Sequence, residues 1–443
     1  MHHVLRFSLS TALLSGCLAL SAKAAADAVA PAQPNIPDRK FSLADFGAVA
    51  DGRTSNADVF RRAIAAVEKS GGGILVVPAG AYFTGPIDLC SQLDLRLARG
   101  ARLVFSDTFA DYPAAGDRVH APISARDCHD IAISGEGTID GNGESWWRRV
   151  LEARAKDRIN GDATAPRPHL IVFDRCQRAR LSGVTLTRSP MFHFVPSRCE
   201  DVTVDGITII SPPDSPNTDG IDPSQTRRML IANCNIDTGD DCIAFKSGGA
   251  GGPSVEDILV TDCTFKRGHG CSVGSTTQAG LRRITIRRCT FDATDVGVRF
   301  KSNRLRGGIC EDVTFTDLIM KNVGTPILIY SYYPFPLGQN LPKPPEPGQH
   351  TASAPVTEKT PIWRRLIVRN ITATGTSGGA GLIIGLPEMP VSELLLENIS
   401  IEAATGLRIG YARNVTLRGV RVVAAKGEPL LIEDTVEGLK RSE

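Results

Sequence analysis

The chain lacks three features that would narrow its function at once. It has few aromatic residues, 6% of 443, and no excess of charge, with 50 Lys and Arg against 48 Asp and Glu. The formal net charge of +2 gives no overall field that would attract nucleic acid, so any acidic ligand must be met by local basic residues. No Cys/His spacing is typical of a zinc site. What the chain does have is ordinary globular composition and 43 glycines, which favours a β-rich fold with many turns.

The one apolar run of note lies at the N-terminus and is too short to span a bilayer. Its single arginine and the sequence Ala22-Lys23-Ala24 are typical of a cleaved secretory signal. We therefore expect a signal peptide (1–24), a Pro/Ala linker (25–38), a single domain (39–436) and a tail (437–443), in a protein exported to the periplasm or out of the cell. Leu14 to Cys17 also resembles a bacterial lipoprotein signal, which leaves anchoring through Cys17 as the alternative.

A short pattern repeats through most of the chain, as in "CEDVTVDGITI" (199–209) and "VEDILVTDCTF" (255–265). Each repeat has a charged or polar pair, a short alternating apolar run, a two-residue polar corner and a second short run. Equivalent positions lie 27, 29, 26 and 29 residues apart, at Val202, Met229, Ile258, Ile284 and Val313. Strands this short at this period fit coils stacked about 4.8 Å apart. The sequence predicts an all-β fold, a right-handed parallel β-helix.

Segments outside the repeat have separate interpretations. After Ser55, a possible N-cap, the sequence predicts a helix that covers the N-terminal end of the solenoid. Its apolar face consists of Val59, Phe60, Ala63, Ile64 and Val67. Residues 144–158 predict a loop excursion with a helical turn, and the proline-rich residues 333–361 are too many for a tight turn.

Ten of the eleven cysteines follow the expected signal peptide. Cys199 and Cys310 occupy one slot of the repeat, and Cys234, Cys263 and Cys289 occupy another. Disulfides form in exported proteins, but equivalent residues of a β-helix stack in ladders, where cysteine serves as a small apolar filler. We expect ladders of buried thiols.

Several charged residues lie about one coil apart. Asp219 precedes Asp240 by 21 residues, and His269 follows Asp241 by 28. Residues one period apart lie on the same face of adjacent coils, so we expect one polar cluster of Asp219, Asp240, Asp241, His269, Arg299 and Lys301. Adjacent residues of a flat strand point to opposite faces, so Asp240 and Asp241 can share this cluster only if the backbone bends there.

The cluster has the chemistry of glycosidic cleavage. Repulsion between carboxylates raises the pKa of at least one of them, so that it holds a proton near neutral pH. A protonated acid can then protonate the leaving oxygen while an ionised one activates water. The nearby arginine and lysine need an anionic partner, for which a sugar carboxylate is suitable.

Four tripeptides carry a family resemblance: "NTD" (217–219), "GDD" (239–241), "GHG" (268–270) and "RFK" (299–301). In this order on a β-helix, they resemble the polygalacturonases of glycoside hydrolase family 28, and "DFGAVADG" and "GLPEMP" are similar to bacterial members. The resemblance implies inverting hydrolysis of α-1,4-linked galacturonic acid in pectin. It makes Asp240 the general acid and gives the activation of water to Asp219 and Asp241. It also implies that His269 hydrogen-bonds the acid.

The same resemblance assigns the substrate contacts. Arg299 and Lys301 would bind the substrate carboxylate, with Asn217 in the same set. Tyr333 matches a tyrosine that lines the sugar site, and Tyr332 is the competing choice. It implies no metal and no cofactor, and we expect a monomer that binds polygalacturonate or pectin oligosaccharides and no nucleic acid. The chain departs from the family pattern at Phe300, where many members have isoleucine and which should point inward. It departs again at 189–197, which often carries tryptophan.

Other interpretations stay open. The three aspartates could cap strands in turns, Asp222 is taken as a turn residue, and Lys246 and Arg267 either extend the basic rim or are merely exposed. A polysaccharide lyase with an Arg or Lys base and calcium, or a non-catalytic carbohydrate-binding β-helix, are the competing functions. Whether an enzyme of this kind would act inside chains or at their ends is not decided, although the two excursions could close the groove.

Overall fold

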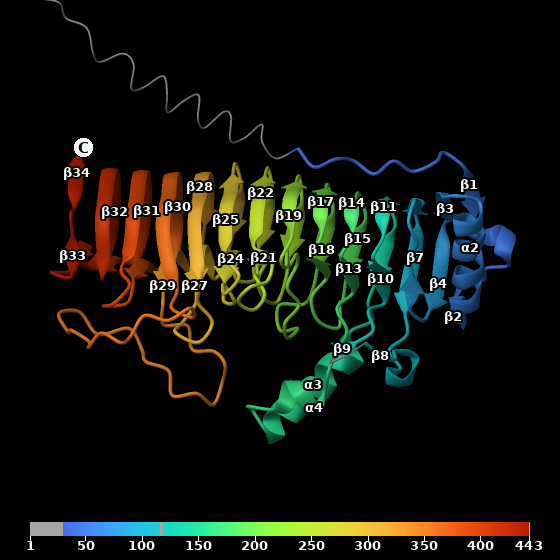
Figure 1. The fold of residues 1–443 in the computed structure, drawn as a ribbon, viewed down its shortest axis with the longest axis horizontal. Coiled ribbons are helices and arrows are strands. Elements are labelled where there is room, and N and C mark those ends of the chain that lie inside the picture. The colour runs from blue at the N-terminus through green and yellow to red at the C-terminus, as the bar shows by residue number, and fades with distance from the viewer. Residues whose placement is uncertain (1–29, 116–117, 443) are drawn as a thin grey trace, which may run out of the picture.

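The chain forms a long solenoid of parallel strands in the computed structural model, which describes residues 30–115 and 118–442 (Figure 1). The expected signal peptide and Cys17 lie outside the described residues. Successive coils stack along the solenoid axis from the blue N-terminal end to the red C-terminal end. Most coils contribute strands to three parallel ladders, and the predicted fold class, a parallel β-helix, is confirmed.

The three ladders run side by side along the solenoid. The first consists of β1 (Lys40–Ser42), β3 (Gly73–Val77), β6 (Leu93–Leu97), β11 (His129–Gly135), β14 (Gln177–Ser182), β17 (Glu200–Asp205), β19 (Arg227–Ala232), β22 (Val255–Thr261), β25 (Leu281–Arg287), β28 (Ile309–Lys321), β30 (Ile362–Ile384), β31 (Val391–Gly410) and β32 (Ala412–Ile432). The second consists of β2 (Asp51–Ser55), β4 (Gly80–Thr84), β7 (Ala101–Phe105), β12 (Thr138–Asp140), β15 (Thr185–Thr187), β18 (Thr208–Ile210), β20 (Asn235–Asp237), β23 (Thr264–Lys266) and β26 (Thr290–Asp292), and it continues into β28. The third consists of β5 (Ile87–Asp88), β10 (Ile123–Arg126), β13 (Ile171–Asp174), β16 (Phe194–Ser197), β21 (Ile243–Phe245), β24 (Cys271–Gly274), β27 (Val296–Lys301) and β29 (Thr325–Tyr330), and it continues into β30. Isolated bridges at Ile221 and Ser224 join β16 to β21.

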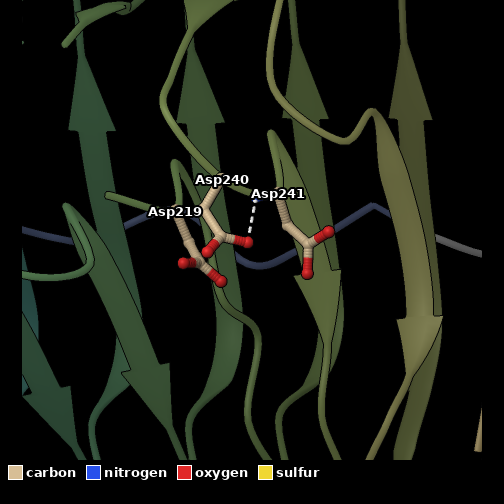
Figure 2. A group of neighbouring side chains, drawn as sticks. All are labelled: Asp219, Asp240 and Asp241. Carbon is tan, nitrogen blue, oxygen red and sulfur yellow. Dashed lines mark hydrogen bonds between the residues drawn. The ribbon is translucent and has the colours of Figure 1, made fainter. Parts of the chain in front are cut away.

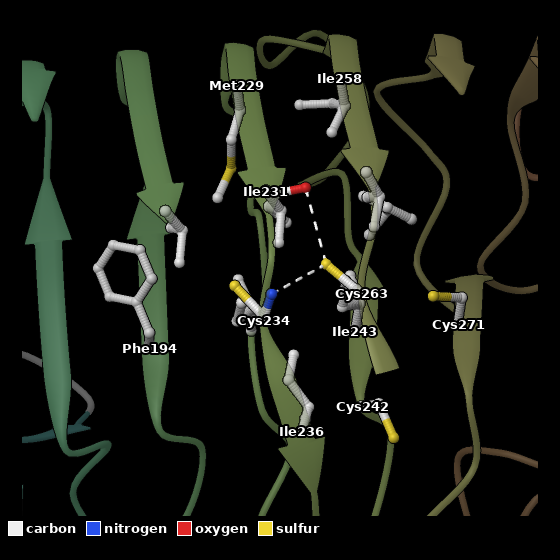
Figure 3. Packing of buried hydrophobic residues seen from close by; sticks show 14 of the residues in the cluster. Phe194, Met229, Ile231, Cys234, Ile236, Cys242, Ile243, Ile258, Cys263 and Cys271 are labelled. Atoms are coloured by element: carbon white, nitrogen blue, oxygen red, sulfur yellow. Dashed lines mark hydrogen bonds between the residues drawn. The ribbon is translucent and has the colours of Figure 1, made fainter. Parts of the chain in front are cut away.

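Apolar side chains from equivalent positions fill the interior in register. Val202 pairs with Met229, then Ile258, Ile284 and Val313, in the order that the repeat predicted. The next partner is Leu366, so the longer gap in the sequence is an insertion between paired strands. All ten cysteines of the described chain are buried and free, which confirms the thiol ladders (Figure 3).

The N-terminal end is covered by α2 (Ala57–Lys69), which buries the predicted apolar face. The predicted cap is wrong by one residue, because Ser55 belongs to β2 and Asn56 is the N-cap residue. The Asn56 side chain makes no capping bond and instead bonds to the backbone of Val49, Thr54 and Phe83, which holds the preceding loop on the sheet. The short helix η1 (Leu43–Phe46) packs beside α2 at this end. The second short helix, η2 (Phe109–Asp111), lies elsewhere, where Phe109 packs against Trp146.

Both ends of the predicted domain carry further ordered contacts. Residues 30–38, expected as part of a linker, run across the coils, where Asn35 donates to Asp130 at 2.9 Å and Gln33 to Thr203 at 2.9 Å. The expected tail contains β34 (Lys440–Ser442), which, like β33 (Val436–Glu437), pairs with β32. No helix among the described residues is long and apolar enough to cross a membrane.

Two excursions leave the solenoid on the same side, below the third ladder in Figure 1. The helical excursion, between β12 and β13, contains α3 (Glu144–Lys156) and α4 (Gly161–Thr164). A small antiparallel pair, β8 (Ala114–Ala115) and β9 (Arg118–Val119), lies near it. The proline-rich insertion, residues 333–361, lies between β29 and β30. A Cβ added to Gly338 of the insertion would lie 3.0 Å from Ile159 Cδ1 of the excursion, so the two segments touch.

One corner of the first ladder carries a column of alternating charge. Each member has a left-handed backbone, with φ between 51° and 58°, and is skipped in the strand register. The members of this corner column are Asp130, Arg178, Asp201, Arg228, Asp257, Arg283, Asp312, Arg365 and Glu393. Each arginine forms an ion pair of 2.6–2.9 Å with the aspartate of the preceding coil.

Candidate active site

The three predicted acids converge on one point above the third ladder. Asp219 precedes the bridge at Ile221, and Asp240 and Asp241 precede β21 one coil later. The amide of Gly220 donates to the carbonyl of Asp241 at 2.9 Å, which fixes the two turns against each other. As a result, carboxylate oxygens of all three acids lie within 4.8 Å of one another (Figure 2).

A bend at Gly239 allows the two neighbouring acids to share the cluster. A Cβ at Gly239 would lie 2.4 Å from the carbonyl oxygen of Ser215, so only glycine fits there. The hydroxyl of Thr238 donates to the carbonyl of Asp240 at 2.9 Å, and the amide of Asp241 donates to the Asp240 carboxylate at 2.9 Å. The chain is therefore bent rather than extended through both acids, as the sequence required.

Asp241 is 2% exposed and is held by two cations. Arg299 Nη1 lies 2.9 Å from Asp241 Oδ1, and Lys301 Nζ lies 2.6 Å from Oδ2. Ser272 adds a hydrogen bond of 2.7 Å to Oδ1. Both cations project from β27 because they are alternate residues, while Phe300 between them points into the core as expected. Burial alone would raise the pKa of Asp241, but Lys301 and Arg299 hold it well below its usual range.

Asp219 is in a different electrostatic environment. It is 3% exposed, and burial raises its pKa well above the usual value, against the attraction of Lys246. Lys246 Nζ lies 3.1 Å from Asp219 Oδ2 and 2.5 Å from Asp222 Oδ2. Burial also raises the pKa of Asp222 to about 6. Asp222 is 1% exposed and paired with Lys246, so the interpretation of Asp222 as a plain turn residue is wrong. Lys246 lines the cavity, so of its two interpretations the one that extends the basic residues of the site holds.

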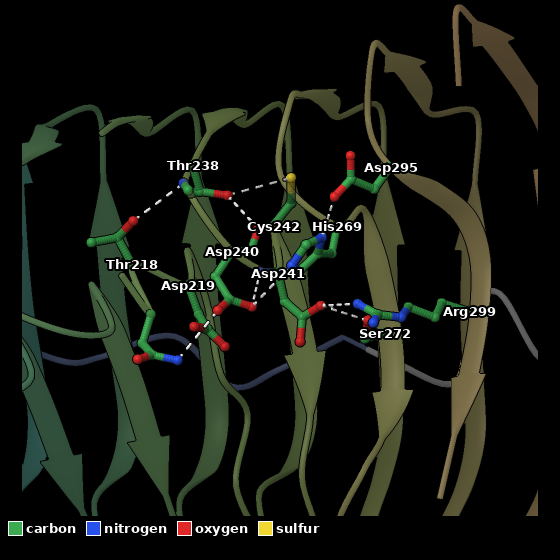
Figure 4. A network of polar contacts seen from close by, with 12 residues as sticks. Thr218, Asp219, Thr238, Asp240, Asp241, Cys242, His269, Ser272, Asp295 and Arg299 are labelled. Atoms are coloured by element: carbon green, nitrogen blue, oxygen red, sulfur yellow. Dashed lines mark hydrogen bonds and ion pairs between the residues drawn. The ribbon is translucent and has the colours of Figure 1, made fainter. Parts of the chain in front are cut away.

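His269 lies beside Asp240 but differs from its expected contact. Its Nε2 is 3.8 Å from Asp240 Oδ1, too far for a hydrogen bond, and its backbone amide donates to the carbonyl of Asp240 at 3.0 Å. The other ring nitrogen lies 2.7 Å from Asp295 Oδ2 (Figure 4). Asp295, which sequence reasoning missed, orients the imidazole with Nε2 toward the acid.

Asn217 connects the acids to the helical excursion. Its amide donates to Asp240 Oδ2 at 3.3 Å. Its carbonyl oxygen accepts hydrogen bonds from Arg154 and, at 2.9 Å, from Arg167. Neither arginine carried a sequence signal, because the excursion has no fixed spacing relative to the coils.

The cluster lines a cavity of about 820 Å³, within the size range of pockets for small molecules. Tyr333 lies in its wall, with its ring centre 5.3 Å from Lys301 Nζ. Tyr332 instead packs in a separate apolar cluster with Tyr411, so of the two candidate tyrosines only Tyr333 lines the cavity. Other lining residues include Asp162 of the helical excursion and Phe335 of the proline-rich insertion.

The acids are close enough together to bind a cation, but amino groups already compensate much of their charge. Lys246 contacts Asp219, and Lys301 contacts Asp241. What the arrangement can do is hold an acid, an ionised carboxylate and basic residues around one bound sugar. General acid and base catalysis needs these groups within hydrogen-bond reach of the reacting atoms.

Comparison with known proteins gives one consistent family. The family model described as Glycosyl hydrolases family 28 matches residues 73–416. An exopolygalacturonase of Platanus acerifolia is 29% identical over 87% of this chain and 97% of its own length. An endo-polygalacturonase of Pectobacterium carotovorum is 32% identical over 59% of this chain and 68% of its own length. The structure of an exopolygalacturonase from Thermotoga maritima superposes with a TM-score of 0.77 and 30% identity, over 91% of this chain and 97% of that one.

Proposed function

Because the chain belongs to glycosyl hydrolases family 28 and is a polygalacturonase-like glycoside hydrolase, we propose that it cleaves α-1,4-galacturonosyl linkages of pectin and polygalacturonate. The observation that carries this proposal is the convergence of Asp219, Asp240 and Asp241 with Arg299 and Lys301. The acids supply proton transfer, and the two cations give the site affinity for a sugar carboxylate.

In the proposed reaction, Asp240 donates its proton to the glycosidic oxygen as the bond to C1 breaks. Water attacks C1, and its proton passes to the pair formed by Asp219 and Asp241. The product has an inverted anomeric centre, and solvent returns a proton to Asp240. His269, 3.8 Å from Asp240, would tighten this contact when substrate is bound.

The spacing of the acids makes the stereochemistry a sharp test. Inverting glycosidases usually have carboxyl groups about 6.5–9.5 Å apart, with water between them. Here the nearest oxygens lie within 4.8 Å, so the water must lie beside the acid and be held by Asp219 and Asp241 together. Proton NMR of the first product formed from an oligogalacturonide should show the β-anomer. A first-formed α-anomer would indicate retention and a covalent intermediate, and would overturn inversion.

A reducing-end assay on polygalacturonate tests the activity itself, with rhamnogalacturonan and xylogalacturonan as comparison substrates. We expect release from polygalacturonate without added calcium. A calcium-dependent product with an unsaturated ring absorbing in the ultraviolet would indicate a lyase. Binding without release of reducing ends would indicate a non-catalytic carbohydrate-binding β-helix.

We further propose that the enzyme acts at chain ends. The helical excursion and the proline-rich insertion begin on opposite sides of the acids along the solenoid, and they touch at Ile159 and Gly338. The insertion is held against the coils of β31 and β32 by two hydrogen bonds. Arg408 donates to the carbonyl of Pro345 at 2.6 Å, and the amide of Thr351 donates to the Tyr411 hydroxyl at 2.9 Å. A cavity bounded in this way admits a chain end more readily than an interior segment. Only short products should appear from the start of digestion, and an early ladder of oligomers would contradict end action.

We also propose export, with cleavage after Ala24 and a single domain that follows. Mass spectrometry of the mature N-terminus from a bacterial host tests this. A mature chain that begins at a lipid-modified Cys17 would show the lipoprotein alternative instead.

A further inference from the structure

Lys246 and Asp222 form an ion pair beside Asp219 that has no role in the reaction proposed above. The Lys246 amino group contacts one carboxylate oxygen of each aspartate, and it lies 3.9 Å from the centre of the Phe192 ring. Asp219 and Asp222 are 3% and 1% exposed. The second oxygen of each, Oδ1, is buried and has no hydrogen-bond partner among the described residues. One cation therefore serves two buried carboxylates that have little other compensation.

Coil stacking produces this arrangement. Asp219 and Asp222 stand three residues apart in the turn "TDGID", and Asp222 lies between the bridge residues Ile221 and Ser224. Ser224 pairs with Lys246 of the next coil, which brings the lysine side chain alongside both acids. The pair is thus built into the third ladder, like Arg299 and Lys301 two coils further on.

We propose that Asp222 and Lys246 are positioning residues that act as a unit. Because Asp222 shares the charge of Lys246 with Asp219, the negative charge of Asp219 is only partly compensated, so that Asp219 accepts a proton from water and releases it again in each turnover. This inference rests on the proposed hydrolysis, in which Asp219 helps to activate water. With Lys246 but without Asp222, the lysine would lower the pKa of Asp219 so far that Asp219 would be a weak base. Without Lys246, Asp219 would stay protonated up to a pH too close to neutral.

The remaining charged groups around Asp219 belong to other parts of the site. Burial lowers the pKa of His193 to about 4, and its Nδ1 bonds to the Asp219 backbone carbonyl at 2.9 Å, so this ring is neutral at the pH of interest. The other groups that act on Asp219 or Lys246 through charge are Asp240, Asp241 and Arg167. Arg299 and Lys301 contact Asp241. The charge of Lys246 also lowers the pKa of Asp241, whereas Asp222→Asn leaves Lys246 in place.

Two single substitutions should move the pH profile in opposite directions. Lys246→Met removes the cation, so the acid limb of kcat/KM on a short oligogalacturonide should move up by about one pH unit. Asp222→Asn removes a negative neighbour and leaves Lys246 to Asp219 alone, so the limb should move down by about one unit. The double variant should lie between the two.

Lys266→Met and Asp292→Asn are matched controls, because these residues stack in register on β23 and β26, away from the cavity. They should leave the limb in place. Shifts in the same direction, or no shift, in the two site variants would overturn the inference and leave a structural pair. If Lys246→Met does not fold, Asp222→Asn alone decides, since its limb must move down. A wild-type protein that is inactive on polygalacturonate would instead overturn the proposed function.

Discussion

The corner column and the acid cluster are built by the same device and have opposite electrostatics. In both, side chains from equivalent places in successive coils are stacked one above another. In the column the sign alternates, and hydrogen bonds from Arg178, Arg228 and Arg365 lower the pKa values of Asp130, Asp201 and Asp312. In the cluster, acids meet acids in a buried place, and burial raises the pKa values of Asp219 and Asp222.

Solvent exposure explains why the ion pairs of the two regions differ in strength. The column arginines are 35–48% exposed, so water screens each pair and each pair adds little stability. Lys301 and Asp241 are almost fully buried, so their interaction is strong and the loss of either partner leaves a charge without compensation. Stacking of the coils therefore only brings charged side chains together. Their burial and the signs of their charges decide whether they stabilise the fold or form a reactive site.

The largest expected effect is the loss of activity when the proposed general acid, Asp240, is replaced. Asp240→Asn keeps the shape of the side chain but cannot donate the proton, so kcat on polygalacturonate should fall by about 10³-fold. The thermal unfolding midpoint should stay near that of the wild type. An active Asp240→Asn enzyme would remove Asp240 from the mechanism and favour the binding-protein alternative.

The next contrast concerns stability. Asp241→Ala leaves Arg299 and Lys301 buried without a partner and should lower the free energy of unfolding by about 3–5 kcal/mol in urea titration. The matched change in the column, Asp257→Ala, leaves the half-exposed Arg283 with its second partner, Glu256, and should lower the free energy of unfolding by less than about 1 kcal/mol. Equal losses at the two positions would contradict the role assigned to burial.

A third change should stabilise the protein. The folded-state pKa of Asp222 is raised to about 6, so the native state holds that proton more tightly than the unfolded chain. Stability is therefore lost as pH rises from about 4 to about 6, and the penalty is complete above that range. Asp222→Asn should raise the free energy of unfolding at pH 8 by on the order of 1–3 kcal/mol. The gain should vanish near pH 4, and a gain that is the same at both pH values would exclude titration as its cause.

The smallest effect belongs to the column. Arg283→Ala should change the unfolding midpoint by little, in line with about 0.5 kcal/mol, and the change should shrink further in 1 M salt. Hydrolytic activity should be unaltered. A loss of activity would mean that the corner column couples to the cavity, which lies on a different ladder.

The fold was readable from the sequence because stacking forces a period, and Val202, Met229 and Ile258 repeat at that period. The acids were readable for the same reason. Arg154 and Arg167 were not, since they reach the site from an excursion whose spacing the coils do not set. Asp295 was missed although it follows His269 by 26 residues, about one coil. Lys246 and Asp222 were visible but ambiguous, because a lysine after a strand or an aspartate in a turn is more often exposed than buried. The alternation of the column was also visible, as the pair that opens the repeats changes between Glu-Asp and Arg-Arg.

That alternation limits how a solenoid of this kind can change length. Duplication or loss of a single coil would bring two arginines or two aspartates face to face about 4.8 Å apart. Gain or loss of two coils at once would leave every neighbour of opposite sign. The corner column therefore tolerates only an even change in the number of coils. During evolution, the solenoid should gain or lose coils two at a time.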